Sequence, residues 1–465
     1  MKEIIKNLRV VLVLFIIVSL ALLAGLFIQE QRSQEELLAV AGENKVALAE
    51  RYGKFAGRIT TKDGFAVAES INGERIYPDK PYSDPYIHLV GDYTHNIANT
   101  IESTYESTLM GSDRSIIEQF LLDISGRGIY GSDIQLTLHN GISQVLAEQM
   151  RYTGYKGTAV LMNWKTGELL AAVSYPAPSY DSLINYRDFE DSSLYNRILS
   201  GSYAPGSTFK MFTSAAWLDS DSFDPNYTVE CHGQSLVPNG PGNLNGLSHG
   251  IINLNSAFSS SCNVFFGSVG YMMGKDYFLN YLNSLAFSEP IYIDKLSVRR
   301  QRADIEVDDA GTIAWFSIGQ PIANSVLNIT PLTHCMYASA VANDGIRMKA
   351  HLVSSVSNPI GRKVKEMSVE ADREIFSSET AADLRTLMEN AAVYNGLTFG
   401  GYTFGLKTGT AEVDGQDGNT SLINTYLYDD NHPYALTMIL ENSPGSHYLI
   451  PFAQNIYREA IYQSP

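Results

Sequence analysis

Hydrophobic and polar positions divide this chain of 465 residues into an apolar N-terminal run, a mixed region and a long region of alternating strands and helices. Residues 10–28 read VVLVLFIIVSLALLAGLFI and carry no charge. A helix of that length spans about 28 Å, close to the thickness of a bilayer core. The pattern therefore predicts a transmembrane anchor over 10–28, preceded by a short cytoplasmic stub over 1–9.

Charges on either side of the apolar run predict its orientation. Lys2, Lys6 and Arg9 precede it, whereas the sequence QEQRSQEELL that follows is net acidic. The positive-inside rule then places the N-terminus in the cytoplasm and the rest of the chain outside. A cleavable signal peptide is the alternative, but its apolar part is usually only about 7–15 residues long. We therefore expect a single-pass protein of the cell membrane with an extracytoplasmic body.

Residues 29–132 are expected to form a stalk and a pedestal. Alanine, leucine and glutamate dominate the stretch up to Tyr52, which is typical of a helix. From Gly57 to Gly131 the pattern is mixed, with turn signals at Asp63-Gly64 and Asn72-Gly73. This part of the sequence predicts a small, partly extended α+β region.

Strand and helix patterns alternate from residue 133 onward. The sequence DIQLTLH from Asp133 alternates as a strand does, and NGISQVLAEQM after it fits an amphipathic helix. The runs Gly157–Met162 and Glu168–Ser174 flank NWKTG and predict a β-hairpin. Three strand-like runs and an amphipathic helix close the chain. We therefore expect one α/β (α+β) domain over 133–465, with a mainly antiparallel sheet built from early and late segments and flanked by helices.

Composition excludes several classes of function. The chain has 33 basic and 50 acidic residues, a net charge of -17, which argues against a nucleic-acid-binding protein. Its three cysteines, Cys231, Cys262 and Cys335, form no CxxC pair, and no cluster of histidines, cysteines or carboxylates has metal-ligand spacing. We expect the cysteines to be buried as small hydrophobic residues, and we infer neither a metal nor a cofactor.

The first candidate for chemistry lies in YAPGSTFKMFTSAAWL, which begins at Tyr203. Pro205 and Gly206 interrupt the preceding chain, and a helix is expected from Ser207, so that Lys210 shares a helix face with Ser207. A lysine kept neutral by burial or by a nearby cation could take the serine proton. Free N–H groups at the helix N-terminus would favour developing negative charge. Alone, the pattern is more simply explained by a capping serine and a surface lysine.

Two other motifs follow in the chain. Ser261 and Asn263 stand in SSSCNVFF at the front of an expected helix, where a hydroxyl and an amide could relay a proton and hold a peptide carbonyl. Alone, they would be explained as a capping serine and a buried asparagine. The third motif, LKTGTAE from Leu406, lies on an expected strand at which Thr408 and Thr410 share one face.

The neighbours of those threonines complete the third motif. Gly409 lets a substrate backbone approach closely. Lys407 points to the opposite strand face from Thr408, but its long side chain near a sheet edge could still reach a shared cleft. A second Lys-Thr-Gly, in WKTGELL, is explained by the hairpin turn: Gly167 can take a positive φ, and Lys165 is expected to project into solvent.

The order SxxK, SxN and KTG with a trailing threonine is the signature of penicillin-binding proteins and class A β-lactamases. The chain resembles in particular the small, monofunctional class B transpeptidases. The opening GRITTKDGFAVAES is similar to the start of the family's extracytoplasmic region, and most of Asp133 to Pro465 is similar to family blocks. These blocks are GTAVLMNWKTGELLAAVSYPAPSYD, NRILSGSYAPGSTFK, LSHGIINLNSAFSSSCNVFF and SIGQPIANSVLNITPLTHCMYASAVANDG. The resemblance implies a β-lactamase/transpeptidase-like domain on a dimerisation-like pedestal.

A D,D-transpeptidase acting on peptidoglycan stem peptides is the function that the resemblance implies. Ser207 would attack the carbonyl of the penultimate D-alanine, with Lys210 as general base. Ser261 would pass a proton towards the leaving amine, and Lys407 would help to set the electrostatics. An amine from a neighbouring stem peptide would then take the acyl group.

Substrate binding is implied for the remaining motif residues. Asn263 would hold the substrate amide, Thr408 and Thr410 would bind the terminal carboxylate beside Gly409, and backbone N–H groups of Ser207 and Thr410 would form the oxyanion hole. β-Lactams would mimic the D-Ala-D-Ala end and trap the serine. Through the same resemblance, a lipid-linked glycan polymerase in the membrane is a candidate partner.

Alternatives to this function remain open at the level of sequence. A D,D-carboxypeptidase or a β-lactamase-like hydrolase would use water in place of the acceptor amine. A largely structural partner in cell-wall assembly is another class, although three intact motifs argue against an inert scaffold. The chain also departs from the family pattern: TSLINTYLYDD stands where many relatives carry a WFxG-like strand, Ala204 stands where a second proline is common, and GRITTKDG lacks an arginine.

Overall fold

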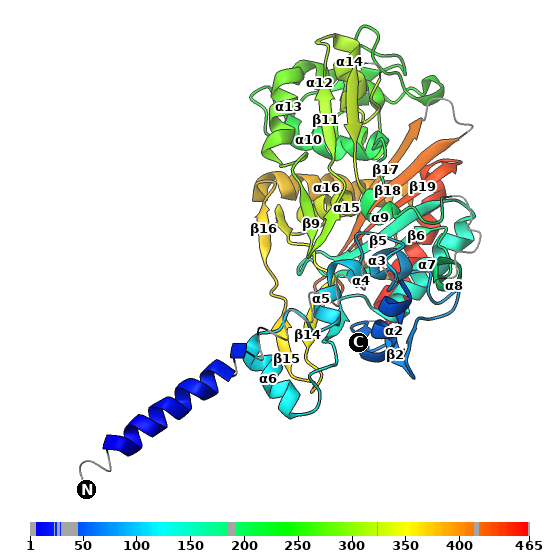
Figure 1. Ribbon diagram of the computed structural model, residues 1–465. Helices are drawn as coiled ribbons and strands as arrows, with labels where there is room; N and C mark the ends of the chain where they lie inside the picture. Colours follow the sequence, from blue (N-terminus) through cyan, green and yellow to red (C-terminus); the bar gives the residue numbers. More distant parts are fainter. Residues whose placement is uncertain are drawn as a thin grey trace.

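The computed structural model describes residues 6–22, 24–25, 28, 45–184, 192–322, 324–412 and 418–463. Residues 6–22 form a helix that projects from the rest of the protein and exposes large apolar side chains (dark blue in Figure 1). Among the described residues, no helix combines the length and the apolar character needed to cross a membrane. The expected span over 10–28 lies partly outside the described residues and stays a prediction.

A five-stranded antiparallel sheet forms the centre of the larger part of the protein, in the order β17-β18-β19-β5-β6. The early hairpin β5–β6 therefore pairs with late strands through β19, which confirms the predicted combination of early and late segments. Strand β17 carries the KTG motif and lies at an edge of the sheet, so one of its sides is open to other elements. The strand bounds are β5 Gly157–Asn163, β6 Leu169–Tyr175, β17 Thr403–Glu412, β18 Asn419–Tyr428 and β19 Tyr434–Ser443.

Helices cover both faces of this sheet. On one face lie α7 (Asn140–Thr153) and the C-terminal helix α17 (Ile450–Gln463), whose apolar stripes share a core with the sheet. On the other face, α15 (Pro331–Ala342) crosses β5, β18 and β19, and all of its side chains are buried. Its sequence is mainly apolar and carries no Asp, Glu, Lys or Arg, which fits a helix enclosed between the sheet and other helices. Helix α16 (Ser378–Asn395) packs beside it against β17.

A helical subregion lies beyond the β17 end of the sheet, at the top of Figure 1. Helices α10, α12, α13 and α14 pack together there around a cluster of phenylalanine rings that includes Phe209, Phe278 and Phe316. The elements of this part are α10 Lys210–Leu218, β7 Val229–Cys231, η2 Leu244–Gly246, β8 Gly250–Ile252, α11 Leu254–Ser259, α12 Asn263–Met273, α13 Lys275–Ser284, β11 Arg302–Ile305, α14 Ala310–Ser317 and β12 Ser325–Asn328.

The pedestal is built on a second sheet, in the order β15-β14-β4-β1-β2-β3. Strand β4, where the larger domain is expected to begin, pairs with β1 of the pedestal and with β14, which returns from late in the chain. This return was not predicted, because no local pattern in a short strand indicates a partner about 220 residues away. The bounds are β1 Ile59–Thr60, β2 Ala66–Ile71, β3 Glu74–Ile76, β4 Asp133–Leu136, β14 Val353–Ser357 and β15 Lys363–Glu366.

Short helices complete the pedestal. The helix expected up to Tyr52 is present from Lys45 onward as α2, which packs on β2 and β3; the preceding part of the expected stalk, residues 29–44, lies outside the described residues. Arg75 and Glu102 form an ion pair with fully buried side chains between β3 and α4. The helices of the pedestal are α2 Lys45–Phe55, α3 Ile87–Val90, α4 Ile101–Thr104, α5 Glu106–Leu109 and α6 Ile116–Ile124.

The remaining elements lie outside the pedestal helices and the two large sheets. They are α8 Tyr180–Ile184, α9 Arg197–Ser200, β9 Ile291–Ile293, β10 Leu296–Val298, β13 Ile346–Met348, β16 Ala371–Glu374, and the short turns η1 Gly206–Phe209 and η3 Ser446–Leu449.

Candidate active site

Ser207 lies in a tight 3₁₀ turn, not in the regular α-helix that the sequence predicts from this residue. The turn η1 covers Gly206–Phe209, and α10 begins at Lys210. In a 3₁₀ turn, side chains at i and i+3 eclipse one another, so Lys210 comes directly over Ser207. The Lys210 Nζ atom lies 2.9 Å from the Ser207 Oγ atom. The tighter turn therefore strengthens the pairing that the helical spacing predicts.

Glycines hold this turn against the edge strand. Gly206 has φ of +50°, and a Cβ atom there would lie 2.7 Å from the carbonyl oxygen of Thr410. Its N–H group donates to the carbonyl of Gly319 at 2.9 Å. On β17 itself, a Cβ atom at Gly409 would lie 2.8 Å from the backbone nitrogen of Thr208. A side chain at Gly206 or Gly409 would therefore separate the serine turn from the KTG strand.

Lys210 is fully buried and surrounded by oxygen atoms. Its Nζ atom lies 2.9 Å from Ser207 Oγ, 2.8 Å from the carbonyl oxygen of Ser261, 3.2 Å from Ser261 Oγ and 2.7 Å from Asn263 Oδ1. Burial, together with the charge of Lys407 nearby, holds the pKa of Lys210 well below its usual range. The neutral amine needed to accept a proton from Ser207 is therefore favoured.

Ser261 and Asn263 are brought to Lys210 by the loop that precedes α12. Ser261 takes φ of +56°, and Cys262 follows as the N-cap residue of the helix. The backbone nitrogen of Asn263 donates to Asn243 Oδ1 at 2.8 Å, and its Nδ2 atom donates to the carbonyl of Gly242 at 3.0 Å. These bonds aim Asn263 Oδ1 at the lysine. Asn243 supports this arrangement, and the sequence analysis did not identify it because it belongs to no motif.

Lys407 reaches the same serine from the edge strand. Its Nζ atom lies 3.0 Å from Ser261 Oγ and 3.2 Å from the carbonyl oxygen of Thr408, over the ring of Phe258. Burial lowers the pKa of Lys407 to about 7. The hydroxyl of Ser261 thus lies between two buried lysines, as the reach of a long side chain from the edge strand allows.

The rest of the KTG motif lies along the outer part of the edge strand. Thr410 is exposed, and its Oγ1 atom lies 3.3 Å from Ser446 Oγ, whereas Thr408 is only 6% exposed. Ser446 begins the turn η3 after β19, and its backbone nitrogen also donates to Thr410 Oγ1 at 3.3 Å. Sequence reasoning missed Ser446; the Pro444-Gly445 pair before it signals a turn but not a position beside the motif.

The other Lys-Thr-Gly lies in the β5–β6 hairpin turn, as predicted. Gly167 has φ of +79°. Lys165 is partly exposed rather than free in solvent: it pairs with Asp430 and lies over the ring of Trp164. Its position is therefore explained by the turn and by a surface ion pair.

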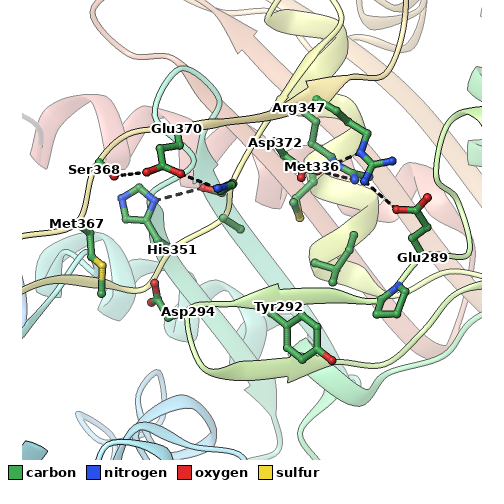
Figure 2. A pocket seen from close by; sticks show the side chains of 15 residues that line it. Glu289, Tyr292, Asp294, Met336, Arg347, His351, Met367, Ser368, Glu370 and Asp372 are labelled. Atoms are coloured by element: carbon green, nitrogen blue, oxygen red, sulfur yellow. Dashed lines mark hydrogen bonds and ion pairs between the residues drawn. The ribbon is translucent and has the colours of Figure 1, made fainter. Parts of the chain in front are cut away.

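A separate cavity of about 390 Å³ lies among β9, β13 and β16 (Figure 2). Six of its charged side chains form ion pairs with one another: Lys349 with Glu370, Arg347 with Asp372, and Arg373 with Glu289. None of the predicted site residues lines this cavity. The chemistry predicted from the motifs therefore belongs to the Ser207 site and not to this cavity.

Ser207 is hydrogen-bonded to the buried Lys210, and Ser261 lies between Lys210 and Lys407 beside the open edge strand β17. This arrangement defines a serine enzyme of the acyl-transfer class. The comparison with known families agrees. Residues 157–462 match the family model described as the penicillin binding protein transpeptidase domain, and the chain belongs to this family. The resemblance drawn from the motifs is thereby confirmed.

Known relatives match most of the length of the chain. The peptidoglycan D,D-transpeptidase PbpA of Mycolicibacterium smegmatis is 28% identical over 454 residues, which cover 89% of this chain and 88% of that protein. Among solved structures, penicillin-binding protein A of M. tuberculosis in a ceftriaxone acyl-enzyme complex has a TM-score of 0.79 at 25% identity, covering 90% of this chain and 99% of that one. The D,D-transpeptidase domain of a peptidoglycan glycosyltransferase from Eggerthella lenta has a TM-score of 0.75 at 26% identity, covering 88% and 98%.

Proposed function

We propose that this protein is a peptidoglycan D,D-transpeptidase that cross-links stem peptides through an acyl-enzyme on Ser207. The observation that carries the proposal is the 2.9 Å contact between Ser207 Oγ and Lys210 Nζ, in which burial and the Lys407 charge lower the pKa of Lys210. A neutral amine at hydrogen-bond distance from a serine hydroxyl is the arrangement that activates the serine as a nucleophile. Family membership and the names of the similar proteins support the same function.

The acylation step follows from the site. Lys210 takes the proton of Ser207 as the serine oxygen attacks the carbonyl of the penultimate D-alanine. Backbone N–H groups of Ser207 and Thr410 stabilise the oxyanion, an arrangement supported by the close approach of Gly206 to Thr410. As the peptide C–N bond breaks, Ser261 donates its proton to the leaving amine and regains one from Lys210, 3.2 Å away.

Deacylation reverses these roles. The amine of a second stem peptide attacks the ester carbonyl, and its proton passes through Ser261 and Lys210 back to Ser207 as the ester bond breaks. Lys407 stabilises negative charge on Ser261 Oγ during each transfer. Thr408, Gly409 and Thr410 line the edge strand where the terminal carboxylate of the donor peptide binds, and the hydroxyl of Ser446 adds a further donor there.

The test uses a labelled β-lactam, which traps the acyl-enzyme. The wild-type protein should take up one label per chain, and Ser207→Ala should take up none. Absence of label in the wild type, or equal labelling of both proteins, would contradict the assignment. The fate of the adduct tests the alternatives: a rapidly clearing adduct indicates a hydrolase, and a D-Ala-D-Ala peptide that yields only hydrolysed product in the presence of an amine acceptor indicates a carboxypeptidase.

We further propose that residues 10–28 anchor the protein in the cell membrane with its catalytic part outside. The charge-free run, the basic residues before it and the exposed apolar side chains of residues 6–22 support this placement. Helix α6 of the pedestal also exposes Ile117, Phe120 and Ile124, a surface suited to a membrane-embedded partner such as a lipid-linked glycan polymerase. Full-length protein should sediment with membranes and resist high salt, and external protease should digest its catalytic part in spheroplasts.

A further inference from the structure

A groove of about 550 Å³ lies beside the SxN loop, between α11 and the C-terminal end of α16. Its lining consists of amides, hydroxyl groups, an imidazole and apolar side chains, and includes Asn255, Ser256 and Ser259 of α11 and Asn390 and Tyr394 of α16. None of the lining residues is an aspartate, glutamate, lysine or arginine. The groove has the size of a ligand site and suits a polar, uncharged stretch of ligand.

The side chains of the groove match the chemistry of a peptide. Asn390 Nδ2 donates to Asn255 Oδ1 at 3.1 Å, which joins the two helices at the groove. Within the described part of the chain, Asn390 Oδ1 and Asn255 Nδ2 form no hydrogen bond, so one acceptor and one donor remain for the N–H and C=O groups of a ligand. The ring of Tyr394 is 66% exposed and adds apolar contact area.

A series of contacts connects this groove to the KTG strand. Asn395 ends α16, and its Nδ2 atom lies 3.4 Å from the carbonyl oxygen of Ser259, whereas its Oδ1 atom lies 2.9 Å from His447 Nε2. Ser446 comes directly before His447, and its hydroxyl oxygen and backbone nitrogen each lie 3.3 Å from Thr410 Oγ1. The groove therefore adjoins the side of the catalytic cleft that Thr410 and Ser446 line.

The direction in which the leaving group departs determines what this side of the cleft must receive. In the proposed acylation, the leaving D-alanine has its carboxylate at Thr410 and Ser446 and its amine beside Ser261. The second amine must attack the same carbonyl carbon and give its proton to the same Ser261, because deacylation by an amine is acylation run backwards. The acceptor therefore enters on the side from which D-alanine leaves, and the groove adjoins that side.

We propose that the groove between α11 and α16 binds the acceptor, a stem peptide whose primary amine attacks the Ser207 ester. This inference rests on the proposed transpeptidase function. The amine nitrogen forms an amide bond with the ester carbonyl carbon, the bond from that carbon to Ser207 Oγ breaks, and the amine proton passes through Ser261 and Lys210 to Ser207 Oγ. A groove without carboxylates suits this step, because it does not stabilise the ammonium form and the attacking amine must be neutral.

Transfer to two acceptors of different size tests the groove. Full-length protein in detergent receives a D-Ala-D-Ala donor peptide together with either glycine, which is too small to reach the groove, or a stem peptide with a free amine. The double variant Asn390→Ala/Tyr394→Ala changes two exposed positions of α16 to the residue that most favours a helix, so it should fold. Its KM for the peptide acceptor should rise about 10-fold, because each lost hydrogen bond accounts for about 2- to 10-fold, while transfer to glycine keeps its wild-type rate.

Tyr462→Ala is the matched control, since it removes a tyrosine that is 84% exposed on α17 and lies outside the groove, and its KM for the peptide acceptor should equal that of the wild type. A wild-type KM in the double variant would overturn the acceptor site, and so would an equal loss of transfer to glycine and to the peptide. A wild type that transfers the acyl group to neither amine would instead contradict the proposed transpeptidase function, so the two failures are distinguishable.

Discussion

Replacing each lysine of the two Lys-Thr-Gly sequences tests whether the fold separates a catalytic copy from a structural one. Lys407 is buried and lies 3.0 Å from Ser261 Oγ, whereas Lys165 is partly exposed and pairs with the exposed carboxylate of Asp430. In the proposed mechanism, Lys407→Ala removes the cation that stabilises negative charge on Ser261 Oγ. Lys165→Ala removes a surface ion pair that has no part in the proposed proton transfer through Ser261.

The expected magnitudes differ widely. Loss of one preorganised donor in a water-excluded site slows a reaction by about 100- to 1000-fold, or about 3–4 kcal/mol, and we expect a loss of this size in acylation for Lys407→Ala. An exposed ion pair contributes about 0–1 kcal/mol to stability, so Lys165→Ala should acylate at nearly the wild-type rate. Lys407→Met fills most of the buried volume and should lose the same catalytic contribution with less disturbance of packing.

The assay is the second-order rate of acylation by a fluorescent penicillin, with thermal unfolding measured on each variant. A loss for Lys407→Ala and Lys407→Met, in proteins that remain folded at the assay temperature, would support the reasoning. Near-normal acylation of Lys407→Met, or an equal loss for Lys165→Ala, would refute it.

Three further predictions concern the pH dependence of acylation, the turn that carries Ser207, and the buried ion pair of the pedestal. The acylation rate should rise with pH through the lowered pKa of Lys210, because the neutral amine is the base. Lys407→Met removes a cation that lowers the pKa of Lys210, so the rise in acylation rate should move to higher pH. A shift of this rise to lower pH would contradict the electrostatic coupling between the two lysines. Gly206→Ala should lose most acylation, measured with the same penicillin, because φ is +50° and the new Cβ would meet the Thr410 carbonyl at 2.7 Å. Glu102→Ala leaves the Arg75 charge buried and should cost about 3–5 kcal/mol in urea unfolding; a cost below 1 kcal/mol would argue against the buried pair.

Much of the larger domain could be predicted because its signals are local. Strand and helix periodicity predicted the hairpin β5–β6, the late strands and α17, and motif order predicted which residues would meet at the site. The meeting of Ser207 with Lys210 follows from a spacing of three residues in either a 3₁₀ or an α-helical turn, so the wrong helix type did not affect it.

The features that sequence reasoning missed depend on contacts distant in the chain. Strand β14 joins the pedestal sheet, Ser446 reaches the KTG strand, and Asn243 supports Asn263, yet each lies in a stretch without a motif. Buried charges were missed for the same reason: the pairing of Arg75 with Glu102 requires a fold that removes both from water. Sequence patterns report the local conformation, whereas these positions are set by what packs against them.

The proposed roles of Lys210 and Lys407 depend on Ser261, which lies between them. Lys210 and Lys407 lie 3.2 and 3.0 Å from Ser261 Oγ, and in the part of the chain that the structure describes neither forms a hydrogen bond with a carboxylate. Two ammonium groups so close in a buried site repel one another, so one proton on the pair is favoured over two, and burial lowers the pKa of each lysine. If Lys407 holds that proton, Lys210 is free to accept one from Ser207, and Ser261 can carry it onward to the leaving amine. The second lysine therefore acts as an electrostatic control on the first, which is why its removal should alter the pH dependence of acylation as well as its rate.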